Sequence, residues 1–244
     1  MQRAVSYPEP TGTNLKRRLR DLQSLGVEEL VFIRRSPGDG VPVLGKGHKG
    51  MVMLGHLGGK EVAVKILRTD ASRDSLEHEA EILKRVNALG VGPRLLAQGE
   101  LTIAMGRVMG EPVKEWIGDL EKMESEKLKT MLVQVMHDCR TMDKEGIDHG
   151  ELSRAGKHII VRHDGRPTII DFETASINRR PSNVTSVCSY FLVGGQPSRK
   201  VREILDLDAP PLAAIKSYKR CFDDRSYRQL LTAANLTGRR THRR

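Results

Sequence analysis

The sequence contains no run of about 18 apolar residues, so no membrane-spanning helix is expected. The first residues, MQRAVSYPEPTGTN, lack the apolar segment of a secretory signal peptide. Cysteine is scarce, and the three that occur, Cys139, Cys188 and Cys221, match no zinc-ligand spacing. An odd number of widely spaced cysteines indicates reduced thiols, as in a cytoplasmic protein.

Positive charge is present in excess. The net charge is +10, and the basic residues cluster at 16–20, 34–35, 179–180, 199–202 and 238–244. Each cluster alone is more typical of a solvated face. Taken together, they favour a polyanionic partner about as strongly as they favour simple solubility.

The order of hydrophobic patterns predicts an α+β fold with two lobes. Leucines at helical spacing predict a basic helix over about 13–26, within an N-terminal extension 1–36 that continues into a strand at 29–35. Lobe 37–105 is expected to hold an antiparallel sheet and one helix, with strands near 41–47, 50–57, 60–67, 94–100 and 101–108 and the helix at 72–89. Lobe 106–236 is expected to be mainly helical, with a long helix at 125–145 and short strands at 158–161 and 168–171. A basic tail follows at 237–244.

A glycine-rich segment, Gly45-x-Gly47-x-x-Gly50, opens the first of these lobes. A dinucleotide-binding glycine loop would lead into a helix, whereas MVML and a Gly-Gly hairpin signal predict another strand here. No GK[ST] follows, which excludes the P-loop. A glycine loop between antiparallel strands lets backbone N–H groups approach nucleotide phosphates.

The strand EVAVKIL places Lys65 on the face opposite Val62, Val64 and Ile66. A lysine in such a strand points to solvent about as often as not, but after a glycine loop it fits a phosphate-binding lysine. In the following helix, Glu79 falls in the middle of the apolar face on a helical wheel. A buried carboxylate needs a partner, and Lys65 is the candidate.

The segment IIDFETAS places Asp171 at the end of an apolar strand. An aspartate there is often only a turn former. It follows the loop HGELSRAGK closely, however, and magnesium takes few protein carboxylates and completes its shell with phosphates and water. Asp171 is therefore the predicted magnesium ligand.

With these motifs in this order, residues 41–175 resemble the protein-kinase-like superfamily. GVGPRLL and HGEL…IIDFE are more similar to the small archaeal-type kinases of the RIO and KEOPS-associated kind, a group that includes tRNA 2′-hydroxyl kinases. The resemblance implies a two-lobed kinase fold with ATP and Mg²⁺ as cofactors. It also implies that Gly45, Gly47 and Gly50 cover the triphosphate, that Lys65 and Glu79 pair, and that the adenine lies against Val52, Ala63, Met105, Gly106 and Val108.

The catalytic loop departs from the kinase pattern. Glu151 stands where kinases carry a catalytic aspartate, and a carboxylate one methylene longer can still accept a hydroxyl proton. Gly156 stands where they carry a metal-binding asparagine. Two alternatives remain: His158 takes that position as a metal ligand, although magnesium prefers oxygen, or Lys157 stabilises the transferring phosphate. His158 is equally consistent with a hydrogen-bonded loop residue.

The resemblance implies an RNA acceptor, a ribose 2′-hydroxyl of a tRNA variable-loop uridine. No A-P-E follows Asp171, as it would in ordinary protein kinases, and Arg179, Arg180 and Asn183 are candidate RNA contacts. An aromatic content of 4% argues against base stacking as the main source of affinity. No DNA partner is expected. The alternatives are a RIO-like serine/threonine protein kinase and an inactive kinase-like RNA-binding module.

Overall fold

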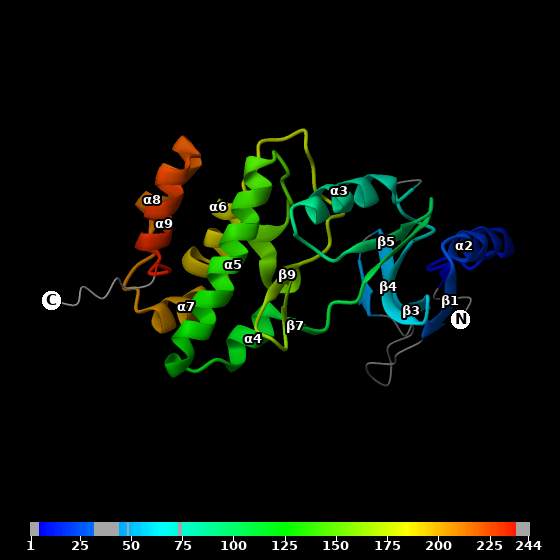
Figure 1. The fold of residues 1–244 in the computed structure, drawn as a ribbon, viewed down its shortest axis with the longest axis horizontal. Coiled ribbons are helices and arrows are strands. Elements are labelled where there is room, and N and C mark those ends of the chain that lie inside the picture. Colours follow the sequence, from blue (N-terminus) through cyan, green and yellow to red (C-terminus); the bar gives the residue numbers. More distant parts are fainter. Residues whose placement is uncertain (1–4, 32–43, 48, 73–74, 238–244) are drawn as a thin grey trace. The chain divides into compact units, whose positions relative to one another are not determined.

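The computed structural model describes residues 5–31, 44–47, 49–72 and 75–237. The predicted strand ends at 32–35 and 41–43, the Arg34-Arg35 cluster and the basic tail from 238 lie outside these residues. The chain divides into two compact units, Met1–Val108 and Met109–Arg244 (Figure 1). Among the described residues, no helix has the length and apolar character needed to cross a membrane.

An antiparallel sheet forms the centre of the first unit. Within the described residues it has six strands, with β1-β3-β4-β6-β5 in order and β2 paired to β3. The strands are β1 Val27–Val31, β2 Gly45–Lys46, β3 Gly50–Leu57, β4 Lys60–Leu67, β5 Leu95–Gln98 and β6 Thr102–Gly106. The hairpin predicted at Gly58-Gly59 is confirmed, because β3 and β4 pair from Gly50↔Leu67 to Leu57↔Lys60.

The two faces of β4 pack against different helices. Val62, Val64 and Ile66 form a core with Leu22 of α2 (Gly12–Ser24). Leu67 packs instead with Leu76 and Ala80, at the start of α3 (Glu77–Ala88). Both faces of the strand are therefore buried, as expected when period-2 alternation places apolar residues on one side and a second helix covers the other.

The predicted N-terminal extension contributes to this unit. Its strand β1 pairs with β3, and its helix α2 covers the β4 face. Arg18 of the basic helix is buried, and its guanidinium donates two hydrogen bonds to the Leu67 carbonyl at 3.0 and 2.9 Å. At least one of the clustered positive charges thus has an internal structural role.

The second unit is mainly helical around a small antiparallel sheet, β7-β8-β9 within the described residues. Its strands are β7 Gly110–Pro112, β8 Ile159–Arg162 and β9 Pro167–Ile169. The α-helices are α4 Val113–Asp119, α5 Ser125–Lys144, α6 Asn183–Cys188, α7 Ser198–Leu205, α8 Leu212–Cys221 and α9 Asp224–Ala233. Short 3₁₀ segments occupy η1 Lys122–Glu124 and η2 Leu152–Lys157, and one π-helical turn occupies η3 Ser189–Val193.

Several boundaries differ from the sequence-based expectation. The segment Gly110–Pro112 was not predicted as a strand, but it forms β7 and pairs with β8 before α4 begins at Val113. Helix α3 begins at Glu77, five residues after the predicted start at 72. Strand β9 ends at Ile169, so Asp171 lies beyond the strand rather than at its last position.

Candidate functional site

A buried ion pair joins β4 to α3 in the first unit. The Lys65 ammonium lies 2.8 Å from Oε1 and 2.7 Å from Oε2 of Glu79. Both side chains are 4% exposed. The pair confirms the prediction drawn from the strand alternation and the helical wheel. A pair this deeply buried persists only with close, well-directed contacts, because each charge has lost its hydration.

The glycine-rich segment lies directly against this lysine. The Gly47 amide donates to the Gly50 carbonyl at 2.9 Å, closing the turn between β2 and β3. A Cβ on Gly50 would lie 2.6 Å from Cε of Lys65. Only glycine allows this approach, and any larger residue would push the lysine away. The segment and the ion pair are therefore one packed feature.

The residues implied to contact adenine lie on neighbouring strands of the same sheet. Val52 is opposite Lys65, and Met105 is opposite Ala63. Directly opposite residues share a face of a sheet, so these three side chains lie on the same face as the lysine. All are half-buried, as are Gly106 and Val108. Gly106 pairs with Val62 at the end of β6, and Val108 is the last residue of the unit.

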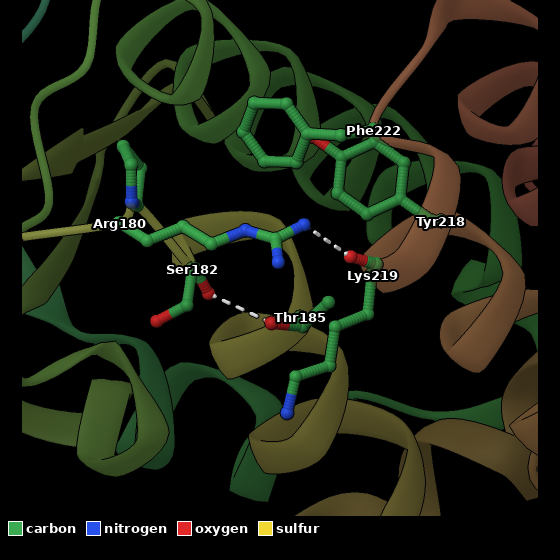
Figure 2. Close-up of a pocket in the computed structure, with 7 residues that line it drawn as sticks. Arg180, Ser182, Thr185, Tyr218, Lys219 and Phe222 are labelled. Atoms are coloured by element: carbon green, nitrogen blue, oxygen red, sulfur yellow. Dashed lines mark hydrogen bonds between the residues drawn. The ribbon is translucent and has the colours of Figure 1, made fainter.

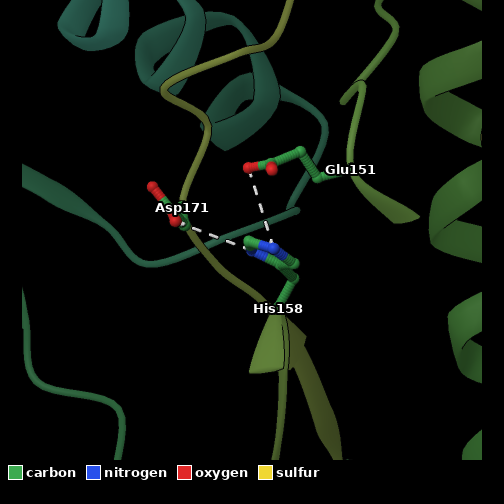
Figure 3. A group of neighbouring side chains, drawn as sticks. All are labelled: Glu151, His158 and Asp171. Carbon is green, nitrogen blue, oxygen red and sulfur yellow. Dashed lines mark ion pairs between the residues drawn. The ribbon is translucent and has the colours of Figure 1, made fainter. Parts of the chain in front are cut away.

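In the second unit, Glu151, His158 and Asp171 lie together (Figure 3). Glu151 precedes η2, His158 follows it, and Asp171 follows β9. Nδ1 of His158 lies 3.6 Å from Oδ2 of Asp171, and Nε2 lies 3.7 Å from Oε2 of Glu151. One candidate ligand atom from each residue falls within 4.8 Å of the others. The imidazole thus lies between the two carboxylates.

His158 is the most buried member of this group. It is 1% exposed, and neither ring nitrogen has a hydrogen-bond partner among the described residues. Burial lowers the pKa of His158, which Asp171 and Glu151 partly oppose. Distances of 3.6 and 3.7 Å exceed those of protein hydrogen bonds, so the imidazole faces both carboxylates without bonding to either.

His149 packs against His158 and is fixed by a contact with the backbone. Its Nε2 lies 3.0 Å from the Ile170 carbonyl, and its ring packs edge-on to His158 with centroids 5.6 Å apart. Burial lowers the pKa of His149 to about 4. This imidazole is therefore neutral near pH 7 and serves as a packed, hydrogen-bonded element.

Asp171 adopts a left-handed backbone conformation, with φ of 68°. Aspartate tolerates this region better than most residues, but it still costs about 1–3 kcal/mol. Such strain is concentrated at functional positions in proteins. The conformation is consistent with a carboxylate whose direction matters.

In the loop that departs from the kinase pattern, Gly156, Lys157 and His158 lie in different surroundings. Gly156, at the position of the kinase asparagine, is buried, and a Cβ there would clash with the Tyr190 hydroxyl. Lys157 is exposed at the end of η2, whereas the next residue, His158, lies beside both carboxylates. A side chain at position 156 has no room, and His158 is the residue of this loop that lies between the two carboxylates.

The donor set of this group does not fit Mg²⁺ well. Magnesium, the ion that the resemblance implies, strongly prefers oxygen ligands and near-ideal octahedral geometry. Two carboxylates would suit it, but the third donor is an imidazole nitrogen that lacks a hydrogen-bond partner among the described residues. Imidazole suits transition-series ions better.

The predicted RNA contacts occupy unlike environments. Asn183 is buried, and its amide donates to Asp143 at 2.9 Å and to the Ile147 carbonyl at 2.6 Å. Its oxygen accepts from the His149 amide at 2.8 Å. With these bonds it anchors the loop that begins at Asp148 in the interior, and we do not retain it as an RNA contact.

Arg179 also has an internal role. Its Nε donates to Asp148, and its Nη2 donates to the Thr174 carbonyl at 2.7 Å. Asp148 accepts further bonds from the amide and hydroxyl of Ser182 at 3.0 and 3.2 Å. The sequence reasoning missed Asp148 as the anchor of this loop. Its place directly before His149-Gly150-Glu151 was the available signal.

Arg180 lines a small pocket of about 140 Å³ that the sequence did not indicate (Figure 2). The guanidinium donates to the Lys219 carbonyl at 2.7 Å and lies 5.7 Å from the Phe222 ring centroid. Phe222 has a left-handed backbone at the end of α8. The lining contains no carboxylate and comprises Arg180, Pro181, Ser182, Thr185, Tyr218, Lys219 and Phe222. The pocket therefore combines two cationic side chains with hydroxyls and aromatic rings.

Comparison of the chain with protein-family models gives no match, and comparison with curated protein sequences gives none either.

Proposed function

We propose that the chain is an ATP-dependent kinase of protein-kinase-like fold that phosphorylates RNA, at a ribose 2′-hydroxyl of tRNA. The observation that carries the proposal is the buried Lys65–Glu79 pair packed against Gly50. A lysine fixed by a glutamate beside a glycine turn is the arrangement that kinases use to hold ATP phosphates.

In this proposal the first unit binds the nucleotide. Lys65 binds the α- and β-phosphates, and Glu79 fixes the direction of its ammonium group. The glycine turn brings backbone amides close to the phosphates. The shared sheet face of Val52, Ala63 and Met105 offers an apolar surface for the adenine ring.

The second unit supplies the proton acceptor for the transfer. The acceptor hydroxyl oxygen attacks the γ-phosphorus, a new P–O bond forms, and the bond from the γ-phosphorus to the β–γ bridging oxygen breaks. ADP leaves with the electron pair of that bond, and the hydroxyl proton passes to the Glu151 carboxylate. Its Oε1 accepts a hydrogen bond from Arg154 Nη2 at 3.0 Å, which fixes the carboxylate. Such transfer depends mainly on positioning and charge.

An RNA acceptor is supported by the charge and by the pocket at Arg180. The net charge is +10, and the pocket lining offers two cations and no carboxylate, as suits a phosphate. A ribose 2′-hydroxyl is an alcohol, so the chemistry is the same as for serine.

A transfer assay tests the activity. The chain is incubated with γ-labelled ATP, a divalent cation, and either total tRNA or a generic protein, alongside Glu151→Gln and Asp171→Asn. We expect label in tRNA, reduced at least about a thousandfold in both variants, which corresponds to about 4 kcal/mol in the barrier. Label only in protein would favour the serine/threonine kinase. ATP binding without transfer to either acceptor would favour the inactive module.

An RNA-binding assay tests the acceptor separately. In the double variant Arg180→Ala/Lys219→Ala, the slope of log affinity for tRNA against log salt should fall by about 2, because two phosphate contacts are lost. The variant Lys216→Ala/Arg220→Ala removes equal charge from exposed positions of α8 outside the pocket, and serves as the control. Equal slopes for the two double variants would exclude the pocket as a phosphate site.

A further inference from the structure

We propose that Glu151, His158 and Asp171 form a mixed nitrogen–oxygen site for a transition-series divalent cation, with Mn²⁺ preferred over Mg²⁺. The inference rests on the proposed function for its biological role, since it names the ion of the same site. Its test measures binding and does not require catalysis.

The first support is the spacing of the donor atoms. Transition-series ions bind nitrogen and oxygen ligands at about 2.0–2.2 Å, so two ligands of one ion lie up to about 4 Å apart. Nδ1 of His158 lies 3.6 Å from Asp171 and Nε2 lies 3.7 Å from Glu151, so one ion takes one of these two nitrogens. One candidate ligand atom from each of the three residues lies within 4.8 Å of the others. Hydrogen bonds would bring these groups closer, and an ion requires about the spacing that is present.

The second support is the state of the imidazole. His158 is 1% exposed, and both its ring nitrogens lack a hydrogen-bond partner among the described residues. An interior polar atom without a partner is costly. A cation bound by one of the ring nitrogens supplies that partner.

The surrounding contacts leave the site available. Arg154 bonds to Oε1 of Glu151 at 3.0 Å, so Oε2 is the oxygen that faces His158. Lys157 is exposed next to His158. Its ammonium group can pair with phosphate oxygens that complete the coordination shell. The room at position 156, where an asparagine oxygen would stand in kinases, is taken by the Tyr190 hydroxyl. Nitrogen therefore replaces oxygen at this site.

The identity of the ion follows from the donors. Magnesium takes oxygen ligands and dehydrates reluctantly. Imidazole suits transition-series ions, and carboxylates and phosphates also suit Mn²⁺. Two carboxylates with one imidazole thus favour Mn²⁺ over Mg²⁺.

The test uses Mn²⁺ itself with the full chain. Electron paramagnetic resonance of free Mn²⁺ gives the affinity, competition with Mg²⁺ gives the preference, and pulsed measurements detect coupling of bound Mn²⁺ to ¹⁴N. We expect nitrogen coupling in the wild-type chain. In His158→Asn, which offers an amide oxygen, coupling should be absent and the Mn²⁺ preference should fall at least about tenfold. His137→Asn, at a side chain 71% exposed, should keep both.

Bound Mn²⁺ without nitrogen coupling in the wild-type chain would overturn the inference, and this measurement needs no variant to fold. The inference would also be overturned if transfer to tRNA is equally fast with Mg²⁺ and with Mn²⁺ and if His158→Asn leaves this ratio of rates unchanged. That result would leave the kinase proposal intact. Nitrogen coupling in a chain that phosphorylates no acceptor would support the site and remove the kinase.

Discussion

The two charged clusters differ in how completely their atoms are bonded. Lys65 and Glu79 contact each other at 2.7 and 2.8 Å in an interior position. His158 lies 3.6 and 3.7 Å from its two carboxylates, and its ring nitrogens have no hydrogen-bond partner among the described residues. In the first cluster the two charged groups bond to each other. In the second the three side chains lie near one another, and the imidazole bonds to neither carboxylate.

This difference in bonding predicts that the two clusters respond differently to substitution. A buried ion pair loses much stability if one partner is removed, because the other charge stays in the interior. A buried imidazole that bonds to nothing contributes little stability, and its removal leaves no charge behind. Substitutions in the two clusters should therefore act on different properties of the protein.

The largest effect is expected from Glu79→Gln. The substitution leaves the Lys65 ammonium buried without its counter-charge and should lower the free energy of unfolding by about 3–5 kcal/mol. Urea denaturation followed by circular dichroism measures the change. The double variant Lys65→Met/Glu79→Leu, which buries no charge, should lose less than the single variant. An unchanged unfolding curve for Glu79→Gln would mean that Lys65 and Glu79 do not form a buried ion pair.

A smaller effect is expected from Gly50→Ala. A Cβ at this position would lie 2.6 Å from Cε and 3.0 Å from Cγ of Lys65, whose ammonium is held by Glu79. Overpacking of this kind should cost about 1–3 kcal/mol in the same denaturation assay. Gly45→Ala is the matched control, because its Cβ would meet Val52 at an ordinary 3.9 Å. Equal losses in both variants would show that glycine is needed for the turn and not for the lysine.

His158→Leu should change the free energy of unfolding by less than about 1 kcal/mol. It removes a buried polar group without a hydrogen-bond partner among the described residues, and this gain offsets the lost ring contact with His149. The comparison between the clusters predicts that Glu79→Gln is several times more destabilising. A loss as large as that of Glu79→Gln would indicate that the imidazole bonds within the fold, and the contrast would disappear.

The smallest effect concerns the buried cysteines of the second unit. Burial raises the pKa of Cys188 to about 12 and that of Cys139 well above its usual range, whereas Cys221 is exposed. Because the thiolate is the reactive form, iodoacetamide at pH 8 should modify Cys221 and spare the other two. Mass spectrometry of peptides measures the rates. Modification of Cys188 at a rate near that of Cys221 would show that this interior opens readily.

Local patterns predicted the parts of the fold whose contacts are close in sequence. The hairpin over 50–67 and the long helix α5 follow from period and turn residues, and Glu79 was placed by its position on the apolar face of α3. Each of these depends on geometry within a few turns or along one hairpin. The sequence therefore sufficed for them.

The features that were not predicted depend on contacts between distant segments. Pairing of Gly110–Pro112 with β8 cannot be inferred from either segment alone. Asn183 was a candidate RNA contact, and only its bonds to Asp143 and to the carbonyl of Ile147 show that it is interior. The pocket at Arg180 depends on α8, which lies far along the chain.

The close approach of Gly156 to the Tyr190 hydroxyl has a consequence for the history of this loop. Replacing Gly156 with asparagine in one step would meet a side chain that is itself buried. Shrinking Tyr190 first would open a cavity, at a cost of about 3–5 kcal/mol if it followed other large-to-small aromatic changes. Whichever of the two residues changes first, the single variant is destabilised, so the two positions should change together. A protein that carries both Gly156 and Tyr190 therefore cannot regain an asparagine at position 156 by a single substitution without a steric clash.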